Sequence, residues 1–328
     1  MKKSGVNMYL SLADGSLVNS KLDADANLVE EILKLKKERN AVILAHYYQP
    51  GEIQALADYV GDSYYLSEMA RDCKEDVIMF CGVRFMAESA KILSPQKRVL
   101  MPCPNAGCNM ADMASGKAVV EMKEKYPDAF VVCYINSTYN VKAHCDVAVT
   151  SSSALKILKN IPNKQILFLP DKNLGGYISE FFPDKEFILW DGFCRCHNKV
   201  SREDILKAKE VHADAKILVH PECTKEIRDM ADYIGSTSGI IDYATSDSGK
   251  EYIVATEEGI LYQLKNKNPD KTFIIPGDRI CCQDMKKTTL ENLYESLLNM
   301  KNEIILDEDI RLKALRSLEN MHKLGSEK

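Results

Sequence analysis

Short apolar runs alternate with amphipathic, helix-like segments along almost the whole chain. Such alternation is typical of βαβ architecture, in which helices cover both faces of a parallel sheet. The first strand-like runs of three successive regions are AVILAHYYQ (41–49), FVVCYINST (130–138) and KILVHPEC (216–223). Each ends in polar residues, and the pattern as a whole predicts an α/β protein.

The predicted elements recur three times in the same order. Each unit has a first strand, a short second strand followed by a serine and a helix, a third strand with its helix, and a fourth strand that leads into a cysteine-bearing loop. Residues at the end of the first strand, spaced by 88 and 86 positions, are His46, Tyr134 and His220. Serines after the second strand, spaced by 88 and 85 positions, are Ser63, Ser151 and Ser236. The loop cysteines, spaced by 86 and 88 positions, are Cys108, Cys194 and Cys282. A period kept by three sets of residues indicates triplication.

We therefore predict an α/β fold of three repeated four-stranded parallel βαβ units, packed as a pseudo-threefold trefoil around a central active site. The predicted boundaries are 1–25 for an N-terminal extension, 26–116, 117–200 and 201–288 for the units, and 289–328 for C-terminal helices. Helix-like segments at 27–39, 114–126, 201–212 and 288–300 flank the units. Ser201 with Asp204 is expected to cap the third segment, and Thr288 with Glu291 the fourth.

The composition of the 328 residues, 45% hydrophobic and 28% charged, is that of an ordinary globular protein. A net charge of −5 without a long basic run argues against a nucleic-acid partner. No apolar stretch approaches the roughly 20 residues that span a bilayer, so no membrane partner is expected. The N-terminus does not resemble a secretory signal, and we expect a cytoplasmic location.

Eleven cysteines in such a chain need an explanation. Cys81 and Cys133 lie in apolar runs and are expected to be buried. Cys108, Cys194 and Cys282 follow the last strand of each unit, where functional groups of parallel α/β units gather. Their separation excludes the paired ligands of a zinc ribbon and the clustered ligands of ferredoxins. Three ligands on separate units suit an iron–sulfur cluster with one open iron that acts as a Lewis acid. The alternative is three unrelated buried cysteines in similar loops.

Polar residues at the strand ends are candidates for substrate binding. Ser63, Ser151 and Ser236–Thr237 stand where helices begin, so they either bind anions or serve as ordinary N-caps. His46 and His220 are either acid–base or anion-binding groups, or they only satisfy the backbone. Tyr134, with Asn136, reads as polar lining of a cavity.

Two further residues are candidates for proton transfer. Tyr48 and Glu222 each lie two positions beyond a strand-end histidine and hence face the same side as that histidine. A carboxylate near a bound dianion has a raised pKa, which suits proton transfer. The alternative for Glu222 is a solvated position at the rim. His197 is a candidate to contact the cluster ligands from behind.

Ten ordered motifs between about residues 26 and 300 resemble the quinolinate synthase (iron–sulfur quinolinate synthetase A) family. They are AHYYQ, GDSYYLSEMA, FMAESAKIL, GCNMAD, YINST, PDKNLG, GFCRCH, HPEC, GST and MKKTTLENL. The resemblance implies a trefoil around a [4Fe-4S] cluster with three cysteine ligands, Cys108, Cys194 and Cys282, and one open iron. At the third ligand the chain has Cys-Gln-Asp-Met, where family members often have Cys-Pro-x-Met.

The resemblance also implies an activity. The family condenses iminoaspartate with dihydroxyacetone phosphate to quinolinate, phosphate and two waters on the path to NAD. An L-aspartate oxidase or dehydrogenase is a possible source of iminoaspartate. The implied substrate-binding residues are His46, Ser63, Tyr134, Asn136, Ser151, His220, Glu222 and Thr237. The resemblance and the positions of these residues at the strand ends together predict three catalytic residues, Tyr48, Glu222 and His220.

Cys282 stands six positions after the strand-ending Pro276, as Cys108 does after Pro102, so we predict that Cys282 is the ligand. Adjacent side chains in an extended segment point to opposite faces, so Cys281 should then point away. Cys103, Cys196 and Cys281 are then extra thiols. Three alternatives remain at this point. One is another trefoil cluster enzyme, such as a reductive dehydroxylase, and a second is a non-enzymatic iron–sulfur scaffold or electron carrier. The third is a zinc-stabilised binding module.

Overall fold

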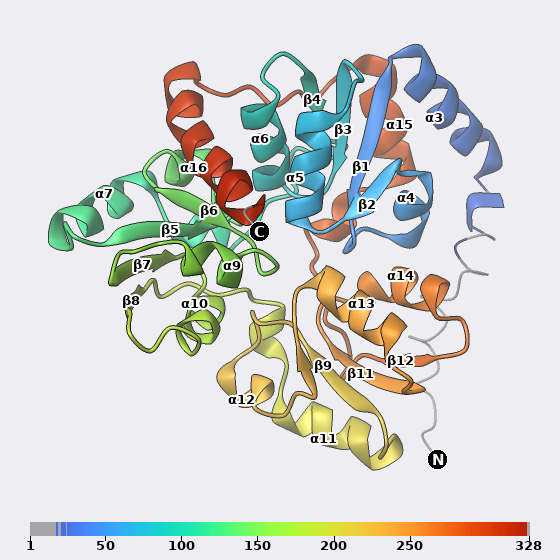
Figure 1. Ribbon diagram of the computed structural model, residues 1–328. Coiled ribbons are helices and arrows are strands. Elements are labelled where there is room, and N and C mark those ends of the chain that lie inside the picture. Colours follow the sequence, from blue (N-terminus) through green and yellow to red (C-terminus); the bar gives the residue numbers. More distant parts are fainter. Residues whose placement is uncertain (1–17, 19–20, 24, 327–328) are drawn as a thin grey trace.

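The computed structural model describes residues 18, 21–23 and 25–326 (Figure 1). Most of the predicted extension, residues 1–25, lies outside the described residues, as do residues 327–328.

The described chain contains three separate four-stranded sheets, and every strand pair in them is parallel. The first sheet consists of β1 (Ala41–His46), β2 (Tyr59–Gly61), β3 (Val77–Cys81) and β4 (Arg98–Leu100). The second consists of β5 (Phe130–Tyr134), β6 (Val147–Val149), β7 (Gln165–Leu169) and β8 (Glu186–Leu189). The third consists of β9 (Lys216–Val219), β10 (Tyr233–Ile234), β11 (Glu251–Ala255) and β12 (Thr272–Ile274). In each sheet the spatial order is second, first, third, fourth strand. The predicted α/β fold of three repeated four-stranded parallel units is confirmed.

The helices repeat with the strands. A helix precedes each sheet: α3 (Ala26–Glu38), α7 (Gly116–Lys125) and α11 (Arg202–Val211). The helices that connect the first three strands and lead to the fourth are α4 (Gly51–Leu56), α5 (Ser63–Asp72) and α6 (Arg84–Leu93) in the first unit. In the second they are α8 (Tyr139–Lys142), α9 (Ala154–Lys159) and α10 (Lys172–Ser179), and in the third α12 (Lys225–Arg228), α13 (Thr237–Ser246) and α14 (Ile260–Lys267). Figure 1 shows the first unit at the top, the second at the left and the third at the lower right.

An aspartate before the second strand fastens it to the first strand in every unit. The carboxylates of Asp58, Asp146 and Asp232 accept hydrogen bonds from the backbone N–H groups of Ile43, Val131 and Ile217 at 2.8, 2.8 and 2.7 Å. Each aspartate also donates its own N–H to the carbonyl of the same strand residue at 2.9 Å. The triplication is therefore present in individual hydrogen bonds as well as in strand order.

Both faces of the third sheet are buried, as a parallel sheet between helices requires. Leu218 and Val254 face one apolar cluster, whereas Val219 and Ile253 face another on the opposite side. Successive strand residues thus alternate between two cores. The first and second units share a further continuous core, which includes Leu44 and Val132.

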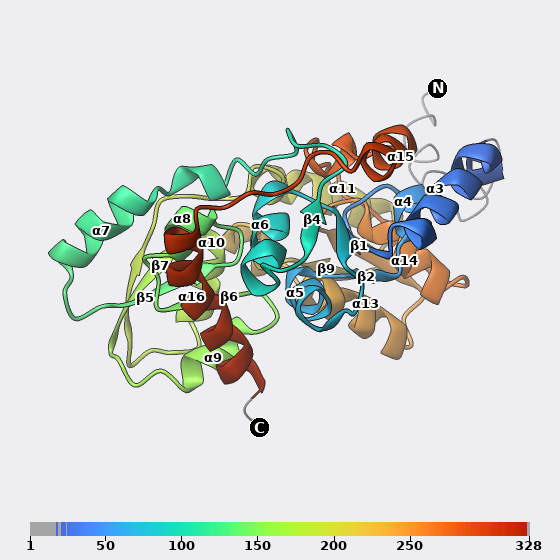
Figure 2. The same cartoon turned by 90° about the horizontal axis from the view of Figure 1, so that it is seen from above.

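Two helices follow the third unit. The first, α15 (Leu290–Asn299), packs on α3, and the second, α16 (Glu308–Ser326), packs on α6 of the first unit and on α8 and β6 of the second. Figure 2 shows the chain crossing from α15 to α16 along the first unit. None of the helices in the described ranges is long and apolar enough to cross a membrane.

Helix capping agrees with the sequence at one helix and differs at another. The Ser201 hydroxyl accepts from the N–H of Asp204 and caps α11 as predicted. The predicted pair Thr288 and Glu291 is wrong by one position, because α15 is capped by a box of Thr289 and Asn292. Thr288 is instead buried at 1% exposure and does not serve as the N-cap.

Candidate active site

All of the predicted site residues line one cavity, which lies beyond the carboxyl ends of the three sheets. Their side chains come from all three units, since parallel sheets place strand-end residues at a common edge. The residues are His46, Tyr48, Ser63, Cys108, Tyr134, Asn136, Ser151, Cys194, His220, Glu222, Thr237 and Cys282. The structure therefore brings together side chains that are up to 236 positions apart in the sequence.

The three cysteines occupy equivalent positions in their units. Cys108, Cys194 and Cys282 each stand three residues before a short 3₁₀ helix, and these helices are Ala111–Met113, His197–Lys199 and Met285–Lys287. The carbonyl of each cysteine accepts a hydrogen bond from the N–H four residues later, at 3.2, 2.9 and 3.3 Å. Cys281 lacks this position and is not among the cavity-lining residues, whereas Cys282 is. The position equivalent to Cys108 and Cys194 thus belongs to Cys282, and its role as a cluster ligand stays a prediction.

All eleven cysteines are free thiols. Cys81 and Cys133 are buried in the strands, as predicted. Burial raises the pKa of Cys108 to about 12. At Cys194 the hydrogen bond with Cys196 lowers the pKa, but burial and the nearby carboxylate of Glu222 raise it to about 12. Such thiols ionise near neutral pH only beside a strong cation such as a metal ion.

Cys196, the extra thiol two positions beyond Cys194, also lines the cavity. Its thiol interacts with those of Cys194 and Cys282 strongly enough to affect its pKa. It also donates to the backbone carbonyl of Cys281 at 3.3 Å. Cys196 thus links the second and third cysteine loops.

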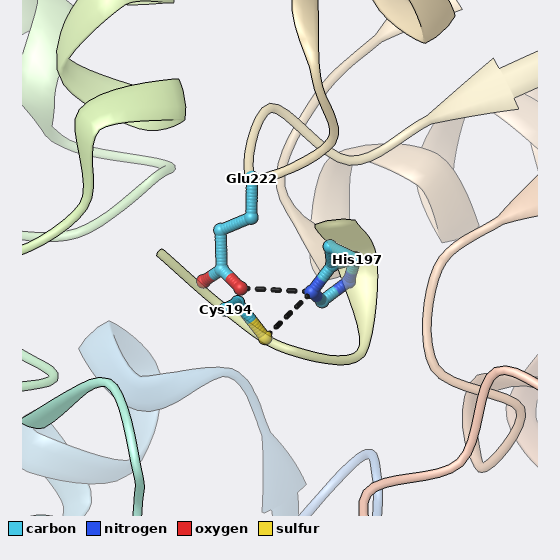
Figure 3. A group of neighbouring side chains, drawn as sticks. All are labelled: Cys194, His197 and Glu222. Atoms are coloured by element: carbon cyan, nitrogen blue, oxygen red, sulfur yellow. Dashed lines mark hydrogen bonds and ion pairs between the residues drawn. The ribbon is translucent and has the colours of Figure 1, made fainter. Parts of the chain in front are cut away.

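Cys194, His197 and Glu222 form a compact group that could hold a metal ion (Figure 3). The Nδ1 atom of His197 lies 2.8 Å from Oε2 of Glu222 and 3.2 Å from Sγ of Cys194. Burial lowers the pKa of His197, but the carboxylate of Glu222 outweighs burial and raises it to about 9. His197 therefore contacts a predicted cluster ligand, in agreement with the sequence prediction.

The charges around Glu222 lower its pKa, whereas a bound dianion beside it would raise the pKa. Burial raises its pKa, but the attraction of His197 and His220, with hydrogen bonds from His197 and Tyr134, leaves the pKa below its usual range. Glu222 is 4% exposed, so the alternative of a solvated rim residue is wrong. Within the cavity it is an ionised hydrogen-bond acceptor.

His46 and His220 are equivalent in geometry as well as in sequence. Nδ1 of His46 accepts from the N–H of Tyr48 at 3.1 Å, and Nδ1 of His220 accepts from the N–H of Glu222 at 3.3 Å. Because Nδ1 is an acceptor, the neutral ring carries its proton on Nε2. Burial lowers the pKa of both rings to about 3. Both histidines are thus neutral near pH 7, with an Nε2–H that can donate to a ligand.

The two predicted tyrosines are held by hydrogen bonds through their hydroxyl groups. Tyr48 lies 2.9 Å from the hydroxyl of Thr237 and 2.8 Å from that of Thr256. Tyr134 donates to Oε1 of Glu222 at 2.7 Å. Burial raises the pKa of both phenols well above the ordinary value, so both are protonated near neutral pH.

The first and third units bring helix N-termini to the cavity. Ser63 and Thr237 are the first residues of α5 and α13, and the N-caps are the preceding Asp62 and Ser236. The alternative of plain N-capping therefore holds for Ser236, but not for Ser63 or Thr237. Their hydroxyls stand beside free N–H groups that favour an anion.

The second unit contributes Ser151 and Asn136. Ser151 precedes the N-cap of α9, Ser153, by two positions, so it is not the cap either. Oδ1 of Asn136 is buried without a hydrogen-bond partner among the described residues. An unpaired buried amide oxygen at a cavity indicates that a ligand or water completes its bonding.

Sequence reasoning missed Glu257, which holds the third cysteine loop. Its buried carboxylate accepts from the N–H of Cys282 at 3.0 Å and pairs with Lys286 at 2.9 Å. Lys286 also donates to the carbonyl of Tyr48 at 2.6 Å. The signal was weak because the first unit has Val83 at the equivalent position, and only the second unit has another carboxylate there, Asp171.

Comparisons with known proteins agree with this site. The family model described as "Quinolinate synthetase A protein" matches residues 30–323. The chain belongs to this family. It is 66% identical over 301 residues to the quinolinate synthase of Clostridioides difficile, covering 92% of this chain and 99% of the relative. It is 58% identical over 296 residues to that of Clostridium perfringens strain 13 (90% and 98% covered). It is 54% identical over 295 residues to that of Caldicellulosiruptor saccharolyticus (90% and 97% covered). The predicted family and the prediction of an enzyme are confirmed.

Proposed function

We propose that the chain condenses iminoaspartate with dihydroxyacetone phosphate to quinolinate, phosphate and two waters, as a step of de novo NAD biosynthesis. The observation that carries the proposal is the convergence of three thiols and a set of anion-binding groups on one cavity. Atoms balance in this reaction without an external electron donor or acceptor. Iminoaspartate would come from an oxidase or dehydrogenase acting on L-aspartate.

We propose that Cys108, Cys194 and Cys282 hold a [4Fe-4S] cluster with one open iron. The fit rests on three free thiols from separate units in equivalent loops. In the described residues, their sulfurs are not a group whose atoms all lie within 4.8 Å of one another. Thiolates on a single tetrahedral zinc would lie only about 3.8 Å apart, since Zn–S bonds are about 2.3 Å long. The wider spacing favours a cluster over one zinc ion. When bound, the open iron supplies Lewis-acid polarisation of a substrate oxygen.

The protein's own groups have distinct proposed roles. The Nε2–H groups of His46 and His220 donate to anionic substrate oxygens. Both substrates are anionic, and a neutral donor avoids the cost of a buried charge when the cavity lacks a ligand. His220 is a catalytic residue in this proposal and acts as such a neutral donor. Burial lowers its pKa and thus disfavours the charged imidazolium form.

Proton transfer is proposed for Glu222 and Tyr48. Glu222 is an ionised carboxylate and can accept a proton, whereas Tyr48 is a protonated phenol and can donate one. The remaining substrate-binding side chains complete the contacts around the two reactants. They are Ser63, Tyr134, Asn136, Ser151 and Thr237.

The proposal is tested with protein purified under anaerobic conditions and supplied with oxaloacetate, ammonia and dihydroxyacetone phosphate. Quinolinate and phosphate should form in equal amounts without an added reductant. Turnover that requires an electron donor would instead favour a reductive dehydroxylase. Absence of any product from protein with a full cluster would favour a non-enzymatic scaffold.

A further inference from the structure

Thr256 occupies a position where all three units meet, although it was not a predicted site residue. It directly follows β11, is fully buried, and is not among the residues that line the cavity. Its hydroxyl oxygen lies 2.8 Å from the hydroxyl of Tyr48, in the first unit, and 2.9 Å from Nε2 of His197, in the second.

These contacts complete a continuous chain of hydrogen bonds. Starting from Glu222, the chain passes through His197 and Thr256 to Tyr48, and from there to Thr237. The carboxylate and the phenol of the proposed proton transfers are therefore both members of one chain. In the described structure Thr256 is the link that joins the Glu222–His197 pair to Tyr48.

We propose that Thr256 is a positioning residue that fixes the direction of the Tyr48 hydroxyl and couples it to the Glu222–His197 pair. This inference rests on the proposed function, because the value of an oriented phenol depends on the reaction at the cavity. Thr256 does not contact substrate and acts only through its two partners.

The donor and acceptor count supports the coupling. A threonine hydroxyl has one proton to donate, while its lone pairs accept. In its ion pair with Glu222, His197 carries a proton on both ring nitrogens, so Thr256 accepts from Nε2. The single hydroxyl proton of Thr256 is then free to point to Tyr48, so the contact with His197 sets the direction of the contact with Tyr48.

Loss of this hydroxyl would affect both partners. Tyr48 would lose one of the two hydroxyls that hold its phenol in place, and Nε2 of His197 would remain buried without an acceptor. A buried polar group left without a hydrogen-bond partner is unfavourable. The phenol would then adopt orientations that the reaction does not use.

The test compares Thr256→Val, which keeps the shape, with Thr256→Ser, which keeps the hydroxyl. Thr256→Val should lower kcat roughly 10- to 100-fold, the range found when a residue that orients a functional side chain by a hydrogen bond is replaced. KM should change little, and Thr256→Ser should restore kcat. A matched control is Thr245→Val, because the partners of the Thr245 hydroxyl, the carbonyl of Ile241 and the side-chain amide of Asn268, are not cavity residues. It should retain wild-type kcat.

A double-mutant cycle with Tyr48→Phe separates positioning from a general structural effect. If Thr256 acts through Tyr48, Thr256→Val should lower kcat much less in the Tyr48→Phe background than in the wild type. Equal losses in both backgrounds, failure of Thr256→Ser to restore kcat, or wild-type kcat in Thr256→Val would overturn the proposal. If Thr256→Val does not fold, Thr256→Ala takes its place in the cycle.

A crystal structure of Thr256→Val provides a readout that does not depend on turnover. Tyr48 should leave its position 2.9 Å from the Thr237 hydroxyl, or His197 should rotate away from Glu222. Unchanged positions of both side chains would overturn the inference even if the wild type makes quinolinate. Conversely, a wild type that makes none contradicts the proposed function, while this structure still decides whether Thr256 positions Tyr48.

Discussion

The imidazole of His197 and the carboxylate of Glu222 form a buried ion pair, with Nδ1 and Oε2 2.8 Å apart. The two residues come from different units, and the side chains are 2% and 5% exposed. Because the same Nδ1 also lies 3.2 Å from the sulfur of Cys194, the pair joins the predicted cluster site to the predicted proton-transfer site.

Replacing Glu222 by glutamine should abolish most activity and leave the iron bound. The amide keeps the size of the side chain but cannot accept a proton, and loss of a general base typically costs 10²–10⁴-fold in rate. Activity and iron content are measured together. Glu226→Gln is the control, since Glu226 is exposed on α12, and it should behave like the wild type. Loss of iron in Glu222→Gln would show that Glu222 has a structural role at the metal site instead.

The adjacent cysteines provide a matched pair of variants. Cys282→Ser should lose iron and activity, because Cys282 occupies the loop position shared with Cys108 and Cys194. Cys281→Ser should retain both, because its side chain is not part of the cavity lining. Iron analysis of the two proteins decides the matter, and the reverse pattern would refute the equivalence of the three loops.

Acid should destabilise the protein through its two neutral cavity histidines. The pKa of His46 and His220 is about 3 in the folded protein, against about 6.5 for an ordinary histidine. Between these values the unfolded chain binds protons that the folded chain does not, so stability falls as the pH is lowered from 6.5 towards 3. Each histidine contributes a slope of up to about 1.4 kcal/mol per pH unit.

Urea unfolding of His46→Gln measures this contribution. Between pH 6 and pH 4 its free energy of unfolding should fall less steeply than that of the wild type. An identical slope in the two proteins would mean that His46 is already protonated in the folded state.

The repeated aspartates should stabilise the fold without taking part in catalysis. Asp146→Ala removes the acceptor of the Val131 N–H and should lower the free energy of unfolding by about 1–3 kcal/mol. Activity at a permissive temperature should remain, because Asp146 is not among the cavity residues. Asp128→Ala, at an exposed position, is the control for thermal unfolding. Equal melting temperatures of the two variants would contradict a stabilising role for the hydrogen bonds between these aspartates and the first strand.

The repeated strands and loops could be predicted from the sequence, whereas hydrogen bonds between side chains of different units could not. The strands and the three loop cysteines recur with one period, so their common position followed from spacing alone. Thr256 could not be predicted in this way, because the equivalent residues, Gly82 and Pro170, have no side-chain hydroxyl that could form a hydrogen bond.

Two other differences have physical causes that a sequence does not display. Thr288 and Thr289 offer the same capping pattern, and only burial of the first shows that the second caps α15. The protonation of Glu222 depends on His197, a partner from another unit. Pairings of this kind arise only when the units are packed together.

The most direct test of the account is the metal content of protein purified anaerobically, measured as iron, zinc and acid-labile sulfide per chain. The account predicts about four iron atoms and four sulfides in the wild type, the content of one [4Fe-4S] cluster. It also predicts their loss in Cys108→Ser, Cys194→Ser and Cys282→Ser, and their retention in Cys81→Ser. Stoichiometric zinc without sulfide, or a full cluster in any of the first three variants, would contradict it.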